Sequence, residues 1–307
     1  MNRLKNIMLL GCCLLLFQAE AQKMQTLTYF RNDTLKLDLD LFLPEKASNT
    51  GFPLLLFVHG GGFSGGERQQ GHSICKYLSQ HGYAAATISY TLYMKGRKFS
   101  CDGVLSEKIQ AFRYAVNDLW LATDFFLSNS QKYNIDVSRI FISGSSAGAE
   151  TVLHAAYWNR DLMQIYGLKL PENFKYAGLV SGAGAIMDLN LITKNNLIPM
   201  MLFHGNGDST VPYATAAHHY CPTDATGWLM LFGSYSIYNH VKELNGTVSL
   251  FTFCGGGHEY SGTLFEKDQQ LILGFMDDVL AGKKFGAHNI IPTGKKNEKS
   301  AAYSFCD

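Results

Sequence analysis

The chain has 307 residues, with 26 Lys or Arg against 25 Asp or Glu and a formal net charge of +1. This balance argues against a nucleic-acid partner, which would require a basic excess. Hydrophobic residues make up 47% of the chain, enough for one large globular domain.

The first 21 residues have the pattern of a secretory signal peptide. Two basic residues precede the apolar stretch 7–17, and Ala-Glu-Ala at 19–21 fits an A-x-A cleavage site. We therefore predict cleavage after Ala21 and a secreted or periplasmic protein. Lipoprotein processing at Cys12 is a less favoured alternative, because it would divide the apolar stretch. That stretch is also shorter than the roughly 20 residues of a membrane-spanning helix.

Beyond residue 21, predicted strands and helices alternate. Leucines at every second position from 35 to 43 predict an antiparallel strand near a sheet edge, and the apolar run 54–58 predicts a strand buried on both faces. Further strands are predicted at 83–89, 140–142, 176–180, 198–203 and 248–253, and helices at 69–81, 106–131, 234–244 and 265–280. Such alternation predicts the α/β class, with a mostly parallel sheet covered by helices on both faces. We expect one domain over 22–290 and a flexible tail over 291–307.

Two segments, 94–104 and 214–233, lack a regular pattern. The second follows a predicted catalytic loop, so we expect it to form either a lid or pocket wall, or an ordinary surface loop. The first segment leaves the same two alternatives open.

Five cysteines remain beyond the predicted signal peptide, and an exported protein permits disulfides between them. They are Cys75, Cys101, Cys221, Cys254 and Cys306. The odd number leaves at least one thiol unpaired within a single chain, and the sequence does not assign the pairs. No C-x-x-C spacing occurs, which argues against a zinc site.

The most informative motif is a glycine-flanked serine directly after a predicted strand. The apolar residues 140–142 are followed by Gly-Ser-Ser-Ala-Gly at 144–148. Glycines permit the sharp strand-to-helix turn of the G-x-S-x-G nucleophile elbow, which presents its central serine at the top of a sheet. The motif predicts Ser146 as the nucleophile of a serine hydrolase, although similar turns also occur as plain connections.

A serine nucleophile requires a base and an acid that orients the base. When the order is serine, acid, histidine, the best candidates after Ser146 are Asp208 and His258. Asp208 follows a predicted strand in His-Gly-Asn-Gly-Asp at 204–208, and His258 follows three glycines after the strand 248–253. Asp188 and Asp224 are weaker rivals for the acid, because they have less strand context.

The glycine run His-Gly-Gly-Gly-Phe at 59–63 follows the buried strand 54–58. Backbone N–H groups of such a loop can stabilise the oxyanion formed when an acyl carbonyl is attacked. We predict Gly61, Gly62 and Ala147 as the donors, and a structural role for His59. Phosphate binding is a poor alternative, because neither G-K-[ST] nor G-x-G-x-x-G accompanies the loop.

No cofactor or metal is expected. The adjacent His218 and His219 could suggest metal binding, but no further ligand stands at a convincing spacing in the sequence.

Together, the segments 59–63, 139–148, 204–213 and 257–259 resemble the α/β-hydrolase superfamily, and within it the HGGG-type esterase/lipase group. The resemblance extends from about residue 54 to 280 and implies an eight-stranded, mostly parallel sheet and hydrolysis through an acyl-enzyme. The chain departs from the pattern at Thr91, where many relatives have Arg, and at Glu150, where a small residue is usual.

These observations predict a serine carboxylic ester hydrolase whose partner is an ester substrate, with no nucleic acid and no membrane span after signal removal. The chain further resembles esterases that remove acetyl or feruloyl groups from plant polysaccharides. One rival is a serine peptidase of the prolyl-oligopeptidase type, although the chain has no room for the propeller of such enzymes. The other is a non-catalytic binding protein on a hydrolase scaffold.

Overall fold

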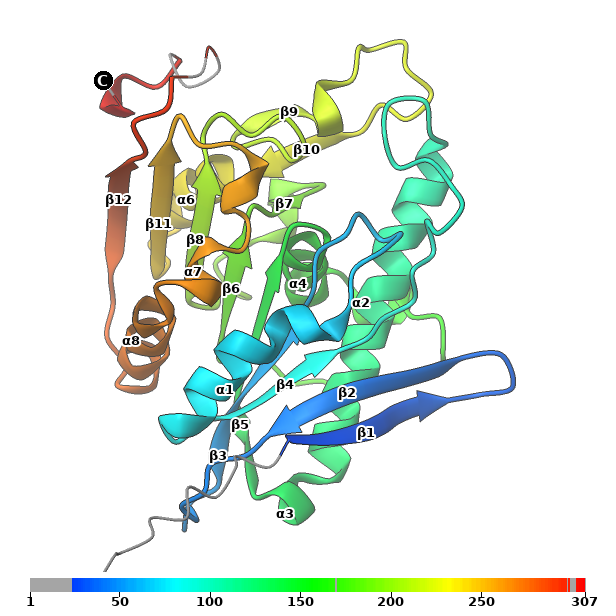
Figure 1. Cartoon of the computed structure of the whole chain (residues 1–307), viewed down its shortest axis with the longest axis vertical. Coiled ribbons are helices and arrows are strands. Elements are labelled where there is room, and N and C mark those ends of the chain that lie inside the picture. Colours follow the sequence, from blue (N-terminus) through cyan, green and yellow to red (C-terminus); the bar gives the residue numbers. More distant parts are fainter. Residues whose placement is uncertain (1–23, 169, 297, 299–301, 307) are drawn as a thin grey trace, which may run out of the picture.

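The computed structural model describes residues 24–168, 170–296, 298 and 302–306, so the predicted signal peptide lies outside the described residues. A nine-stranded sheet runs through the molecule in the order β1-β2-β4-β3-β5-β6-β8-β11-β12 (Figure 1). Its strands are Met24–Arg31 (β1), Lys36–Phe42 (β2), Phe52–Val58 (β3), Ala84–Ile88 (β4), Ile135–Ser145 (β5), Gly178–Gly182 (β6), Met200–Gly205 (β8), Val248–Cys254 (β11) and Gly286–Pro292 (β12).

The sheet is mostly parallel, as predicted. Only β2 pairs antiparallel with its two neighbours β1 and β4, and every other pair in the sheet is parallel. The expected number of eight strands is wrong by one. β1 and β12, which form the two edges of the sheet, were not predicted from the sequence.

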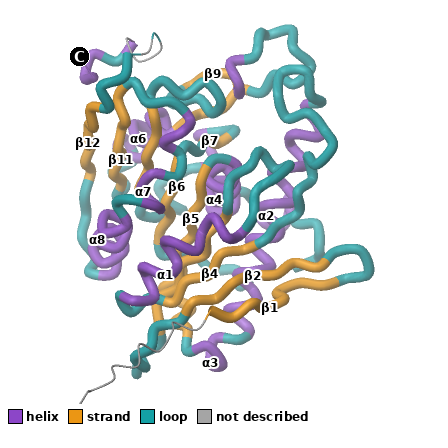
Figure 2. Tube along the Cα trace, in the orientation of Figure 1, coloured by secondary structure: helices purple, strands orange, loops and turns teal. Residues whose placement is uncertain are grey.

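Helices cover both faces of the sheet (Figure 2). They are His72–Gln80 (α1), Leu105–Ser128 (α2), Ser130–Tyr133 (α3), Ala147–Tyr157 (α4), Arg160–Met163 (α5), Ser234–Glu243 (α6), Thr263–Glu266 (α7) and Gln269–Leu280 (α8). Buried side chains of α2, α4 and α6 share one core cluster, and those of α1, α7 and α8 share a second. In β3, Leu54 and Leu56 join the first cluster while Leu55 and Phe57 join the second. This alternation explains why the run 54–58 is apolar throughout.

The segment 214–233 has regular structure that its sequence did not predict. It contributes Thr215–Ala217 (β9) and Met230–Gly233 (β10) to a small antiparallel sheet with Ala185–Ile186 (β7). This sheet lies beyond the carboxyl end of the central strands, where ligands bind in folds of this class (Figure 1).

The structure assigns the cysteine pairs that the sequence left open. Cys101 is bonded to Cys221 and Cys254 to Cys306, while Cys75 is a buried free thiol. The second bond also changes the interpretation of the C-terminus. β12 extends to Pro292, beyond the predicted domain end, and Cys306 is attached to the end of β11. This part of the expected tail is therefore held to the domain, through sheet hydrogen bonds and a covalent bond.

No helix within the described ranges combines the length and apolar character needed to cross a membrane.

Candidate active site

Ser146 lies at the tight turn between β5 and α4, as the elbow motif predicts. Its backbone has a φ of 54° and a ψ of −123°, a strained conformation for a residue with a side chain. The turn requires both flanking glycines. A Cβ at Gly144 would lie 2.3 Å from the Gly148 backbone, and a Cβ at Gly148 would lie 2.0 Å from the carbonyl oxygen of Val58. The two glycines thus allow the sharp turn that places Ser146 at the carboxyl end of β5, in the middle of the sheet.

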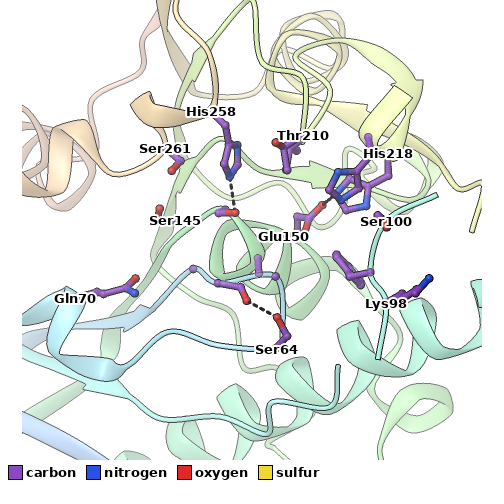
Figure 3. Close-up of a pocket in the computed structure, with 18 of the residues that line it drawn as sticks. Ser64, Gln70, Lys98, Ser100, Ser145, Glu150, Thr210, His218, His258 and Ser261 are labelled. Carbon is purple, nitrogen blue, oxygen red and sulfur yellow. Dashed lines mark hydrogen bonds and ion pairs between the residues drawn. The ribbon is translucent and has the colours of Figure 1, made fainter. Parts of the chain in front are cut away.

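The structure brings Ser146, His258 and Asp208 together, although they are far apart in the sequence. Ser146 Oγ lies 2.8 Å from His258 Nε2, and His258 Nδ1 lies 2.7 Å from Asp208 Oδ2 (the first contact is the dashed line from His258 in Figure 3). In the neutral imidazole, Nδ1–H then donates to the carboxylate and Nε2 accepts from the serine hydroxyl. This is the hydrogen-bonding order that activates a serine nucleophile.

Asp208 is fully buried in the loop after β8, and its carboxylate is well supplied with donors. Oδ1 accepts from the backbone N–H groups of Thr210, at 2.7 Å, and Val211, at 3.0 Å. Burial acts to raise the pKa of Asp208. The hydrogen bonds from His204 and His258 outweigh this effect and hold the pKa well below its usual range. The carboxylate therefore stays ionised at neutral pH.

His204 was not identified as a site residue from the sequence. It is fully buried in β8, and its Nε2 lies 3.2 Å from Asp208 Oδ2, the same oxygen that His258 contacts. Its Nδ1 lies 3.0 Å from Ser234 Oγ, so the hydroxyl can fix the imidazole with Nε2 protonated. The available signal was its position four residues before Asp208 at the end of a buried strand.

The glycine loop after β3 lies opposite the elbow. Gly61 has a φ of 118° and Gly62 a φ of 59°, both in the region that favours glycine. A Cβ at Gly61 would lie 2.3 Å from the carbonyl oxygen of Gly65. His59 is buried, stacks on Tyr90 at 4.4 Å between ring centroids, and lies 2.7 Å from the carbonyl oxygen of Gly60.

These elements line a cavity of about 700 Å³. The predicted oxyanion donors Gly61, Gly62 and Ala147 all border it, together with Ser146 and His258. The two irregular segments also contribute: residues 98–100 and 102 come from the first, and 218–219 from the second. The disulfide Cys101–Cys221 joins the two segments. Segments 94–104 and 214–233 therefore form walls of the pocket and are not ordinary surface loops.

A second polar group occupies one wall of this cavity. Glu150, one helical turn after Ser146 in α4, is buried with its Oε1 3.5 Å from His218 Nε2, and His219 lies beside His218 (Figure 3). Burial raises the pKa of Glu150 well above its usual value, although the Lys108 ammonium acts in the opposite direction. Burial also disfavours the charged form of His218, and so lowers the pKa of this imidazole well below its usual value. The sequence marked Glu150 and the His pair separately and did not predict that they meet.

The rival acids lie away from this site. Asp188 caps a short helical turn, accepting from the backbone N–H of Asn190 at 2.9 Å, and neither Asp188 nor Asp224 borders the cavity. Among the residues that the structure describes, no group of three His, Cys, Asp or Glu could hold a metal ion.

The sheet, the elbow and the glycine loop define an α/β-hydrolase fold. Solved structures of Thermogutta terrifontis esterase 2 share it. The form phosphorylated by paraoxon has a TM-score of 0.63 at 16% identity, covering 85% of this chain and 95% of that one. The apo form has a TM-score of 0.63 at 17% identity, covering 85% and 96%. At these identities the likeness shows the fold alone.

The sequence comparison identifies the family. The BD-FAE family matches residues 39–195, just over half of the chain, and the chain belongs to this family. This confirms the predicted resemblance to the HGGG-type esterase group of α/β-hydrolases. A curated relative, fumonisin B1 esterase of Sphingopyxis macrogoltabida, is 27% identical over 145 residues. The match covers 44% of this chain and about a quarter (26%) of the relative's own length.

Proposed function

We propose that the protein is a serine carboxylic ester hydrolase with Ser146 as nucleophile, His258 as base and Asp208 as the acid that orients it. The observation that carries this proposal is the continuous chain of contacts from Ser146 Oγ to His258, at 2.8 Å, and on to Asp208, at 2.7 Å. Membership of the BD-FAE family and the similarity to fumonisin B1 esterase support the same activity.

In the proposed mechanism, Ser146 Oγ attacks the acyl carbonyl carbon while His258 Nε2 takes the hydroxyl proton. The carbonyl oxygen becomes an oxyanion, for which the backbone N–H groups of Gly61, Gly62 and Ala147 are the proposed donors. The C–O bond to the alcohol then breaks, and His258 gives its proton to the leaving oxygen. Water, activated by His258, hydrolyses the acyl-enzyme and restores Ser146.

We further propose that the enzyme is exported and acts on esters attached to carbohydrate, such as acetyl or feruloyl groups of plant polysaccharides. Two disulfides support export, because they form and persist in oxidising compartments. The polysaccharide substrate rests on the sequence resemblance. Comparing acetylated xylan, feruloylated sugars and proline-containing peptides as substrates would separate this proposal from a peptidase.

The direct test of the activity is hydrolysis of short p-nitrophenyl esters by the wild type and by Ser146→Ala. We expect activity in the wild type, a loss of several orders of magnitude in the variant, and labelling by a fluorophosphonate probe of the wild type alone. Equal rates in the two proteins would refute the assignment. A folded wild type that neither hydrolyses the esters nor reacts with the probe would support a non-catalytic binding role.

A further inference from the structure

Three polar side chains form a group beside the proposed triad that the hydrolytic mechanism does not use. We call Glu150, His218 and His219 the Glu150 cluster. All three border the same cavity as Ser146. The backbone N–H of Glu150 donates to the carbonyl oxygen of Ser146 at 3.0 Å, so the carboxyl group is anchored one turn from the nucleophile. Figure 3 shows Glu150 and His218 pointing toward one another across the cavity wall.

The cluster contains buried polar atoms that the protein itself does not satisfy. Glu150 Oε1, His218 Nδ1 and His219 Nε2 have no hydrogen-bond partner within the described parts of the chain. The 3.5 Å between Glu150 Oε1 and His218 Nε2 is too long for a good hydrogen bond. A buried polar group left without a partner destabilises the protein. Three such atoms on one wall of a cavity indicate a site that a ligand completes.

The backbone that carries the two imidazoles is strained and firmly held. His219 has a φ of 56° and Tyr220 a φ of 53°, although neither is a glycine. The next residue, Cys221, is bonded to Cys101, and the backbone N–H of His219 donates to the carbonyl oxygen of Thr210 at 2.9 Å. Strain of this kind persists where the surrounding structure imposes it, and it is concentrated at ligand-binding sites.

The cluster suits an uncharged ligand group that both donates and accepts. Glu150 and His218 lie in a buried setting that opposes the charged form of each. The nearby Lys108 already donates to the carbonyl oxygen of Gly227 at 2.7 Å, and its ammonium lies over the Phe99 ring, 5.4 Å from the ring centroid. A hydroxyl group can both donate to and accept from a neutral carboxyl group and a neutral imidazole, whereas a carboxylate only accepts and would bring a negative charge into the same buried setting.

The position of the cluster favours the alcohol portion of the substrate. In the proposed mechanism His258 protonates the leaving oxygen, so the alcohol lies on the His258 side of the nucleophile. Thr210 lines the cavity on that side and is hydrogen-bonded to His219, so one continuous wall joins the acid loop of Asp208 to the imidazole pair.

We propose that Glu150, His218 and His219 bind hydroxyl groups on the alcohol portion of the substrate, and so make the enzyme selective for esters of polyols over esters of simple alkyl alcohols. This inference rests on the proposed esterase activity and adds the residues that determine its alcohol specificity.

The test compares two acetates whose alcohols have the same three-carbon chain, glycerol monoacetate and propyl acetate. We expect the wild type to have a kcat/KM about tenfold or more higher for glycerol monoacetate. Glu150→Met and His219→Leu replace a polar side chain with an apolar one of similar size. Each should reduce the ratio of the two kcat/KM values by about three- to tenfold, the effect of one or two hydrogen bonds. Should Glu150→Met fail to fold, as judged by its thermal unfolding, His219→Leu carries the same test from a different segment.

Glu45→Gln is the matched control, because Glu45 is exposed in the loop between β2 and β3. It should leave the ratio unchanged. A wild-type ratio near one, or a ratio that neither cluster variant alters, would overturn the inference while leaving the esterase activity intact. A preference for acetoxyacetate over glycerol monoacetate would overturn it too, because the cluster would then bind an anion. Absence of any hydrolysis, including that of p-nitrophenyl acetate, would instead refute the proposed function on which the inference depends.

Discussion

His204 and His258 contact the same oxygen of Asp208, at 3.2 Å and 2.7 Å. The buried His204 lies within the sheet and the partly exposed His258 at the cavity. Asp208 Oδ2 is therefore held from behind by one imidazole while it orients the other.

We predict that His204 positions Asp208. His204→Leu removes a donor to the carboxylate and should lower kcat for p-nitrophenyl acetate about tenfold, with little change in KM. His204→Gln retains an N–H group and should recover part of the loss. Steady-state kinetics of both variants provide the measurement, and equal losses in the two would indicate a packing role only.

Asp208→Asn should reduce kcat by about 10⁴-fold, because the amide can present an N–H to His258 Nδ1 and so stabilise the wrong tautomer. The fold should tolerate the change, since the amide oxygen can still accept from the backbone N–H groups of Thr210 and Val211. Kinetics and thermal unfolding of the same preparation would check this. A variant that retains a tenth of the wild-type rate would exclude Asp208 as the catalytic acid.

Gly61→Ala should lower kcat about 10²- to 10³-fold through loss of an oxyanion donor. The added Cβ would meet the carbonyl oxygen of Gly65, at 2.3 Å, and the φ of 118° is unfavourable for alanine. Gly274→Ala provides the control. Gly274 lies in α8, and a Cβ there meets nothing within 4 Å among the described residues. This control should raise the free energy of unfolding by up to about 1 kcal/mol with unchanged kinetics.

Replacing both Cys101 and Cys221 by serine should lower the free energy of unfolding by about 2–4 kcal/mol. It should also raise KM, because the bond joins the two segments that form one wall of the cavity. Denaturant unfolding and steady-state kinetics with glycerol monoacetate would measure the two effects. A loss of stability with an unchanged KM would show that the wall keeps its shape without the bond.

Asp118 should make stability depend on pH. Burial raises the pKa of Asp118 to about 7, above the value near 3.9 that is usual in an unfolded chain. The folded state thus favours the protonated carboxyl group. The free energy of unfolding therefore falls as the pH rises from about 4 through 7. The free energy of unfolding falls by about 4 kcal/mol at most, because the two pKa values differ by about three units and each unit corresponds to about 1.36 kcal/mol.

Asp118→Asn keeps an oxygen that can accept from the backbone N–H of Thr91, which donates to Asp118 at 2.6 Å, and cannot ionise. Its stability relative to the wild type should therefore be greater at pH 8 than at pH 5. Urea unfolding of both proteins at the two pH values is the measurement. An equal difference in stability between variant and wild type at pH 5 and at pH 8 would contradict a raised pKa of Asp118.

The sequence predicted the interior of the sheet better than its edges. Runs such as 54–58 are apolar because both faces are buried, and this signal is local. β1 and β12 have mixed, partly exposed faces, so their strand character depends on the neighbours with which they pair. Ser146, Asp208 and His258 could be proposed because each stands in a recognisable turn after a strand. The meeting of Glu150 with His218, 68 positions further along the chain, depends on tertiary packing and leaves no local pattern.

The edge position of β12 has a consequence for the order of folding. β12 pairs with β11, whose end leads into the loop of His258, and Cys306 is bonded to Cys254 at that same end. β12 and Cys306 both follow every proposed catalytic residue in the sequence. The central strands can pair before β12 and Cys306 are in place, but the loop of His258 receives its full support only once residue 306 has joined the fold. A chain interrupted shortly before that point would contain every proposed catalytic residue and still lack the bond that anchors the base.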